Sequence, residues 1–292
     1  MNKCATSSVL AFQPYGEIQL DARDQSDFIV GTPAFIALDE PGLSAATYSV
    51  MSSFNPHSLE SLHNATLMSR VDSKFLLPSS RLDELLEFLL PYYTILEING
   101  MRSFTYQTRY YDTPNHMHYM RHHNGRLNRF KIRKRTYQES QTSYLEVKFK
   151  DRNRRTAKTR IQWDMDSPNL CPEAMAFLES CEVPEVELLE AVQSGTYQRI
   201  ALASEARGER LTIDCNINFQ NTTSGIRHEI GPWVIAELKQ DVIDRHSAIH
   251  DWARAHNIRS VPFSKYCMGM YFTGAPELKR NNFHPVARQL RA

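Results

Sequence analysis

The chain has 292 residues, of which 41% are hydrophobic and 23% charged, a composition typical of a globular protein with a sizeable core. Its five cysteines are odd in number and form no Cys-x-x-Cys pair, which argues against a disulfide framework or structural zinc site and favours a reducing cytoplasm. No apolar run is long enough to cross a bilayer, and we find no signal-peptide pattern, so we expect a soluble protein that reaches a membrane only through a partner.

The N-terminal residues 1–53 show no sustained hydrophobic period, and we predict a poorly ordered extension there, with Met51 as an alternative start. Organised structure is expected from Phe54 onward. A helix should open at Ser80 as N-cap, with Asp83 in its first turn. Pro91 should end this helix, whose apolar stripe consists of Leu82, Leu85, Leu86 and Leu89.

The formal net charge of +1 conceals a segregation of charge along the chain. The segment from Arg129 to Arg160 contains twelve Lys or Arg residues and three Asp or Glu residues. The segment from Asp164 to Glu190 contains eight acidic residues and no basic one. A basic block indicates an anionic ligand, although a solvated basic face is the alternative explanation.

The middle and end of the chain contain segments in which charged and apolar residues alternate. We predict five such strands, at Arg129–Tyr137, Tyr144–Lys150, Lys158–Trp163, Arg210–Phe219 and Ala236–Lys239. Between and after them, helices are predicted near Glu173–Cys181, Val186–Ala206 and His246–His256. Alternation places the charged side chains of each strand on one face.

Two structures could explain these two-faced strands. One is a sheet with one wetted side. The other is a barrel with charge inside and helices outside, which is favoured by isolated carboxylates among the cations and by the many arginines. We therefore predict an α+β fold built around a tunnel wide enough for a ligand.

A series of short motifs, taken in order over about residues 54–275, resembles the VTC (vacuolar transporter chaperone) domain, the polyphosphate polymerase branch of the triphosphate tunnel enzymes. The first motifs are Arg70-Val-Asp72-Ser-Lys74-Phe75, Arg109–Pro114, Tyr119 with His122–Gly125, and Arg129–Tyr137. The later ones are Tyr144–Lys148, Lys158-Thr-Arg160, Tyr197-Gln-Arg199, Arg210–Asp214, Glu237-Leu-Lys239 and Ser264-Lys265-Tyr266.

The resemblance implies an eight-stranded antiparallel β-barrel covered by outer helices over 54–275, followed by a C-terminal tail at 276–292. Its charged interior would bind ATP and polyphosphate, and the γ-phosphoryl group would pass to the growing chain. The catalytic residues it implies are Arg133, Arg135, Lys148, Arg199, Arg210 and Glu237. The phosphate or ATP contacts it implies are Lys74, Lys158, Tyr197, Lys239 and Lys265. Glu237 would hold Mn²⁺ or Mg²⁺, which take oxygen ligands and often few protein carboxylates.

One departure from the wider tunnel superfamily reduces the number of activities that the resemblance implies. Its hydrolases and cyclases usually open with Glu-x-Glu-x-Lys, whereas this chain has Arg70, Asp72 and Lys74 at the matching positions. This argues against a thiamine triphosphatase or a class IV adenylyl cyclase. Asp72 is expected to pair with a neighbouring cation.

Three functions remain open at this stage. They are a polyphosphate polymerase, a tripolyphosphate or nucleoside triphosphate hydrolase, and a non-catalytic polyphosphate-binding subunit. Nucleic acid is not expected as a ligand, because aromatic residues do not alternate with the basic ones as a single-strand platform requires. The histidines at 116, 118, 122 and 123 lack zinc-helix spacing and are expected to be structural. The sequence leaves the oligomeric state and a membrane-protein partner undetermined.

Overall fold

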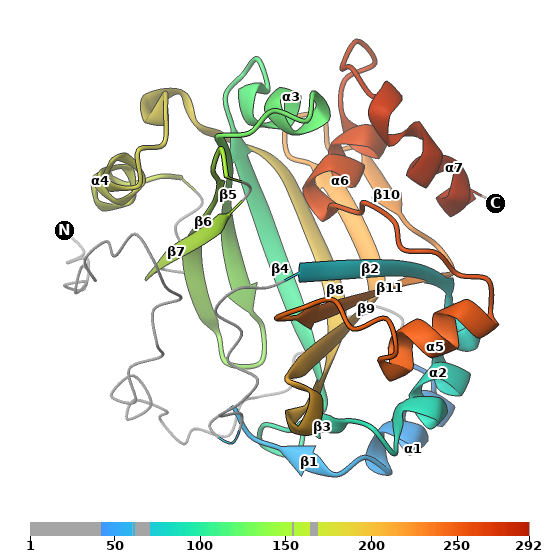
Figure 1. The fold of residues 1–292 in the computed structure, drawn as a ribbon. Helices are drawn as coiled ribbons and strands as arrows, with labels where there is room; N and C mark the ends of the chain where they lie inside the picture. The colour runs from blue at the N-terminus through green and yellow to red at the C-terminus, as the bar shows by residue number, and fades with distance from the viewer. Residues whose placement is uncertain (1–41, 60, 62–70, 154, 164–168, 292) are drawn as a thin grey trace.

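The computed structural model describes residues 42–59, 61, 71–153, 155–163 and 169–291. One large, mostly antiparallel sheet organises them, and its main path runs β2-β11-β9-β8-β4-β5-β6-β7 (Figure 1). The strands of this path are β2 (Val71–Pro78), β4 (Ser103–Asp112), β5 (Arg129–Tyr137), β6 (Thr142–Lys150), β7 (Thr156–Gln162), β8 (Glu190–Ser204), β9 (Glu209–Asn221) and β11 (Trp233–Gln240). Short strands flank it: β1 (Pro56–His57), β3 (Thr94–Leu96) and β10 (Arg227–Glu229).

Helices lie at the ends and outside of the sheet (Figure 1). The α-helices are α1 (Ala45–Ser52), α2 (Leu82–Leu89), α3 (Met117–His123), α4 (Pro172–Ser180), α5 (Ala248–Ala255), α6 (Lys265–Thr273) and α7 (His284–Arg291). The 3₁₀ turns are η2 (Ser79–Arg81), η3 (Val186–Leu188), η4 (Glu205–Arg207) and η5 (Asn281–Phe283). In the described part of the chain, no helix has the length and apolar character that a bilayer crossing requires.

The expected closed barrel is not confirmed, because the sheet stays open in the described residues. Strands β2 and β7 stand at opposite ends of the path. The outer edge of β2 is occupied by a later segment instead: Phe75 forms an antiparallel bridge with Ser260, and the Val261 amide donates to the Lys74 carbonyl at 2.8 Å. At Lys74 and Phe75, the edge of β2 therefore pairs with this segment rather than with β7.

The outer face of the sheet is apolar and is covered by helices, as expected. One core cluster contains Trp252 of α5 and apolar side chains of β2, β8, β9 and β11. It also buries the apolar stripe of α2, which consists of Leu82, Leu85, Leu86 and Leu89. On the other half, α4 packs on apolar residues of β5 and β6. Burying these stripes is the main stabilising term of such a fold.

The start of α2 differs from the expectation. Ser80 lies within η2, and Arg81 takes the N-cap position without a side-chain hydrogen bond. Asp83 is in the first turn as predicted, and it also accepts a hydrogen bond from Thr47 of α1 at 2.6 Å. The carboxylate therefore joins two helices in addition to its favourable position near a helix N-terminus.

The prediction of a helix over Val186–Ala206 is wrong. Apart from η3 at its start and η4 at its end, this stretch forms β8, which pairs with β4 along one edge and with β9 along the other. Its Ala, Leu, Glu and Gln residues favour helix when considered locally. Pairing on both edges outweighs that local preference, because strand stability depends on cross-strand neighbours and burial.

Two helices lie outside the expected 54–275 domain, whose boundaries remain predictions. Met51 of α1 is buried in the core beneath α2. Val286 and Leu290 of α7 are buried in a cluster with Phe263 and Met268. Residues 1–41, including most of the expected extension, lie outside the described residues, as does Arg70.

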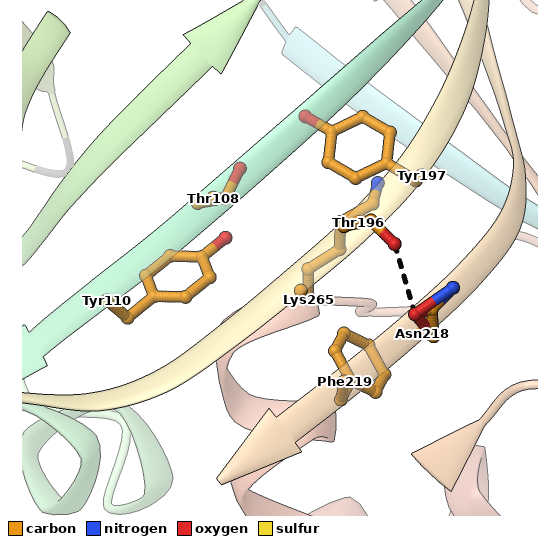
Figure 2. A pocket seen from close by; sticks show the side chains of 8 residues that line it. Thr108, Tyr110, Thr196, Tyr197, Asn218, Phe219 and Lys265 are labelled. Atoms are coloured by element: carbon orange, nitrogen blue, oxygen red, sulfur yellow. Dashed lines mark hydrogen bonds between the residues drawn. The ribbon is translucent and has the colours of Figure 1, made fainter. Parts of the chain in front are cut away.

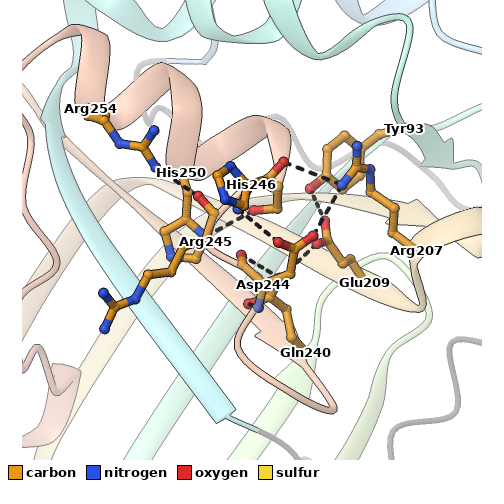
Figure 3. Close-up of polar contacts among 10 residues, drawn as sticks. Tyr93, Arg207, Glu209, Gln240, Asp244, Arg245, His246, His250 and Arg254 are labelled. Atoms are coloured by element: carbon orange, nitrogen blue, oxygen red, sulfur yellow. Dashed lines mark hydrogen bonds and ion pairs between the residues drawn. The ribbon is translucent and has the colours of Figure 1, made fainter.

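A polar cluster around the buried Glu209 ties the start of β9 to the loop after β11 (Figure 3). Glu209 is 1% exposed, and its carboxylate accepts from the Tyr93 hydroxyl at 2.6 Å and from the Gln240 amide at 2.7 Å. Arg207 and Asp244 form an ion pair beside it at 3.2 Å. Because these groups form hydrogen bonds and an ion pair with one another, we assign the cluster a structural role.

Candidate functional site

The strand registers bring the predicted site residues onto one face of the sheet, which we call the charged face. Cross-strand partners point to the same side of a sheet. The charged face therefore contains six partner pairs: Lys74↔Glu237, Lys239↔Arg210, Arg199↔Asp214, Arg133↔Glu146, Lys131↔Lys148 and Lys148↔Lys158. Arg135 joins them because it lies two residues after Arg133 on β5.

Glu146 of β6 forms the first acidic centre of this face. Its carboxylate lies 2.7 Å from Arg133 Nε, 2.6 Å from Lys158 Nζ and 3.9 Å from Arg135 Nε. Burial alone would raise the pKa of Glu146, but these three cations hold it well below its usual range. Glu146 is therefore a permanent anion that keeps three predicted phosphate contacts together.

Asp214 of β9 forms the second acidic centre and was not among the predicted site residues. Its two oxygens accept from Arg199 Nε at 2.6 Å and Arg199 Nη2 at 2.8 Å, and it also pairs with Lys265. Burial would raise the pKa of Asp214, but Arg199 and Lys265 lower it. Its place in the Arg210–Thr212–Asp214 alternation was the available sequence signal.

Lys265 reaches the charged face from the N-terminus of α6 rather than from a strand. The segment 261–265 crosses from β2 toward β5: Lys74 Nζ donates to the Phe263 carbonyl at 3.0 Å, and Lys131 Nζ donates to Ser264 Oγ at 2.9 Å. Ser264 also caps α6 through the Cys267 amide. This segment therefore covers part of the charged face where the sheet itself stays open.

Tyr197 is buried beside this segment and lies among cations (Figure 2). Its ring stacks on Tyr106 at a centroid distance of 5.2 Å, and Lys265 Nζ lies 4.2 Å from its centroid. Burial would raise the pKa of the Tyr197 hydroxyl, but Arg135, Arg199 and Lys265 lower it. Cation–π contacts of this kind hold the aromatic ring and the cations in fixed positions.

Lys131, which lies on the predicted basic strand but was not among the predicted site residues, is half-buried at the junction of β5 and α6. Burial lowers the pKa of Lys131 to about 7, and Lys148, Lys74 and Arg133 add to the effect. Burial likewise lowers the pKa of Lys158 to about 7, although Glu146 opposes the shift. Both lysines therefore titrate near neutral pH.

Several buried polar atoms of the charged face have no hydrogen-bond partner among the described residues. They include Thr108 Oγ1, Arg135 Nε and Thr212 Oγ1. Buried polar groups normally find partners, so polar atoms without a hydrogen bond on this face are consistent with a polar ligand. Lys148, Arg210 and Lys239 are placed on this face by register, and each of them has contacts of its own.

A divalent cation is the cofactor the resemblance implies, and Glu237 is the carboxylate best suited to hold it. Glu237 lies 3.6 Å from Lys74, farther than Glu146 lies from Arg133 (2.7 Å) or Asp214 from Arg199 (2.6 Å). Burial would raise the pKa of Glu237, but Lys239, Lys74, Arg199 and Lys265 hold it well below its usual range. It is therefore available as an anionic oxygen ligand.

Protein ligands alone would not complete such a metal site. In the described ranges no group of three or more His, Cys, Asp or Glu side chains could hold a metal ion. Within α3, a ring nitrogen of His122 is hydrogen-bonded to the Phe130 backbone carbonyl, and one of His123 to the side-chain oxygen of Asn124. Glu237 fits a metal ion that arrives with phosphate oxygens as its other ligands.

Comparison with solved structures gives distant similarities. A candidate adenylate cyclase from Bacillus halodurans shares 14% identity over 67% of this chain and 94% of its own, with a TM-score of 0.44. A candidate adenylyl cyclase from Hippeastrum, described as having a dominant triphosphatase activity, shares 13% identity over 71% and 98%, with a TM-score of 0.45. A Pyrococcus horikoshii protein shares 13% identity over 69% of this chain and 99% of its own, with a TM-score of 0.39. At these scores the similarities carry no argument about function.

Comparison with protein families is more informative. Among curated proteins, no relative matches this chain. The VTC domain family matches residues 69–273, which include all the strands of the main path and α6. On this match, the chain belongs to the VTC domain family.

Proposed function

We propose that this protein is a triphosphate-binding enzyme that transfers the γ-phosphoryl group of ATP to a growing polyphosphate chain. The observation that carries the proposal is the charged face itself. Cations from β2, β5, β6, β7, β8, β9, β11 and α6 converge there and outnumber its carboxylates Asp72, Glu146, Asp214 and Glu237. A linear polyanion is the ligand that such a surface would neutralise.

The proposed roles follow from the two halves of the charged face. One stretch of phosphates would be bound by the cations of β5, β6 and β7, namely Arg133, Arg135, Lys148 and Lys158. The next stretch would be bound by Lys74, Arg199, Arg210, Lys239 and Lys265, and Tyr197 would lie between the two groups. Phosphoryl transfer needs positioning and charge neutralisation more than covalent help from the protein. Arginine contributes a planar fork that matches phosphate oxygens, and lysine contributes a compact charge.

Glu237 would hold Mn²⁺ or Mg²⁺ bound to the phosphates. When bound, the ion would neutralise charge on the transferring group. A cytoplasmic location and a membrane-protein partner remain predictions, which cell fractionation would test.

The deciding experiment is incubation of the purified protein with ATP and Mn²⁺ or Mg²⁺, with products separated by length on a gel. Chains of phosphate would support the polymerase. Short phosphate alone would identify a hydrolase, and the absence of turnover with retained polyphosphate binding would identify a non-catalytic subunit. Either of these two results overturns the polymerase proposal.

Glu237→Gln tests the metal assignment because it removes the anionic charge and nearly preserves the shape. We expect turnover to fall strongly while binding of metal-free tripolyphosphate is retained. Arg245→Ala, which removes a cation from an exposed loop outside the charged face (Figure 3), is the control and should leave turnover unchanged. Full metal-dependent turnover in Glu237→Gln would move the metal site elsewhere.

A further inference from the structure

The first turn of α6 presents side chains in two directions. Lys265 points to Asp214 on the charged face. Tyr266, the next residue, is 1% exposed, and its hydroxyl donates a hydrogen bond to Oδ2 of Asp112 at the end of β4. The backbone that carries Lys265 is therefore attached to β4 on its other side.

Asp112 is a fixed anchor for this attachment. Its side chain is fully buried, and its oxygens accept backbone hydrogen bonds from Thr113, His118 and Tyr119, each at 2.8 Å. A buried carboxylate is stable only when its oxygens are satisfied in this way. Because three donors belong to the chain at and before the first turn of α3, the carboxylate cannot shift without disturbing that helix.

The ring of Tyr266 is held as firmly as its hydroxyl. It stacks on Tyr110 of β4 at a centroid distance of 4.9 Å and meets Tyr119 of α3 edge-on at 6.2 Å. Burial and the neighbouring Asp112 raise the pKa of Tyr266 well above its usual value, so the hydroxyl stays protonated as a donor. The ring and hydroxyl together fix the start of α6 against β4 and α3.

We propose that Asp112 and Tyr266 are positioning residues that hold the first turn of α6 so that Lys265 reaches the phosphates. The inference rests on the proposed function, because it assumes that Lys265 binds phosphate. It assigns a task to Asp112, whose carboxylate is linked to the backbone of Lys265 through the Tyr266 hydroxyl. Neither residue contacts the substrate in this proposal.

The primary test is Tyr266→Phe, which removes the hydroxyl and keeps the stacked ring. We expect the affinity for tripolyphosphate, measured by titration calorimetry, to fall by up to roughly tenfold, since hydrogen bonds to charged groups contribute at that scale. Tyr119→Phe is the matched control. It removes a hydroxyl of the same aromatic cluster, one that donates to the Lys279 carbonyl at 2.9 Å beyond the far end of α6. Tyr119→Phe should lower Tm without changing tripolyphosphate affinity.

A double-mutant cycle with Lys265→Ala separates positioning from general destabilisation. If Tyr266 acts through Lys265, Tyr266→Phe should cause no further loss of affinity once Lys265 is alanine. An equal loss in both backgrounds, or wild-type affinity in Tyr266→Phe alone, would overturn the positioning role. Unchanged affinity in Lys265→Ala would instead overturn the phosphate site assigned to Lys265, and the inference with it.

Discussion

Lys131 and Lys158 are the two lysines of the charged face whose pKa burial lowers to about 7, and Lys131 is the one that does not face Glu146 across an ion pair in the described residues. Burial lowers its pKa to about 7, and nearby Lys148, Lys74 and Arg133 disfavour its charged form further. A bound polyanion would favour the charged form and raise that pKa. Between pH 7 and the raised value, binding must therefore take up a proton.

We predict that tripolyphosphate affinity falls as pH rises from 7 to 9, by at most about tenfold per pH unit for each proton taken up. The falling sign follows because a higher pH removes the proton that binding requires. Lys131→Met, which has a similar length and no titrating group, should bind more weakly but with a shallower pH slope. Calorimetry in buffers of different ionisation enthalpy measures the proton uptake. Subtracting the proton uptake of Lys131→Met from that of wild type removes the contribution of ligand titration. Equal pH slopes of affinity in the two proteins would exclude Lys131 as the proton acceptor.

Arg135 tests whether the arginines act during transfer or only attract anions. Its Nε has no hydrogen-bond partner in the described residues and lies 3.9 Å from Glu146, so a phosphate oxygen could accept from it. We predict that Arg135→Ala lowers the maximal rate by roughly a hundredfold, more than it weakens ATP binding. Arg135→Lys should recover part of the loss, since it keeps the charge and loses the fork.

Steady-state kinetics of both Arg135 variants, with melting temperatures to exclude misfolding, provide the measurement. If Arg135 only attracts anions, Arg135→Ala should raise KM and leave kcat intact. Arg135→Lys should then bring KM most of the way back to the wild-type value. Equal kcat in wild type and Arg135→Ala would remove this residue from the catalytic set.

At the scale of the elements, β8 holds the two halves of the charged face together. It pairs with β4 and β9, and it carries Tyr197 and Arg199 toward Lys265. Gly195 allows the two backbones to approach closely, because an added Cβ would lie 2.7 Å from the Asn218 carbonyl oxygen and 3.3 Å from the Phe219 ring. Backbone atoms in a paired strand have little room to move.

We predict that Gly195→Ala destabilises the protein by about 1–3 kcal/mol, the usual cost of overpacking. Chemical denaturation should show the change as a lower midpoint with an unchanged m-value. Gly225→Ala is a useful comparison, since no atom lies within 4 Å of its added Cβ, although its positive φ of 71° strains any side chain there. A midpoint for Gly195→Ala equal to that of wild type would contradict the close approach.

At the scale of the whole molecule, a net charge of +1 coexists with a strongly cationic face. The cations of that face repel one another, and Glu146, Asp214 and Glu237 relieve this only in part. A bound polyanion would relieve the remaining repulsion in the folded state alone. Ligand binding and folding stability should therefore be linked.

We predict that tripolyphosphate raises the stability of the fold by about 2.7 kcal/mol at a concentration 100 times its Kd. For a chain of this size, that corresponds to a rise in Tm of roughly 4 °C. Scanning calorimetry with and without tripolyphosphate measures the shift, and sodium chloride at the same ionic strength is the control. An equal shift in chloride would indicate general screening rather than binding at the charged face.

The sequence by itself determined the features that depend on local alternation. The two-faced patterns of β5, β6, β7, β9 and β11 are visible in the chain because side chains of a strand alternate between faces every second residue. The same patterns placed Arg133, Arg135 and Lys148 on one face, and the ordered motifs identified the family that the comparison confirmed. The apolar stripe of α2 was equally local, with a period near four residues.

Only the tertiary structure decided the features that depend on contacts between distant segments. The sequence of β8 favours a helix locally, and pairing on both edges makes it a strand. The chain at Ser260 occupies the edge of β2, so the sheet stays open in the described residues where a closed barrel was expected. Lys265 reaches Asp214 because α6 is anchored to Asp112, a residue 154 positions from Tyr266 in the chain. Such contacts arise from packing and burial, which no local pattern of residue types encodes.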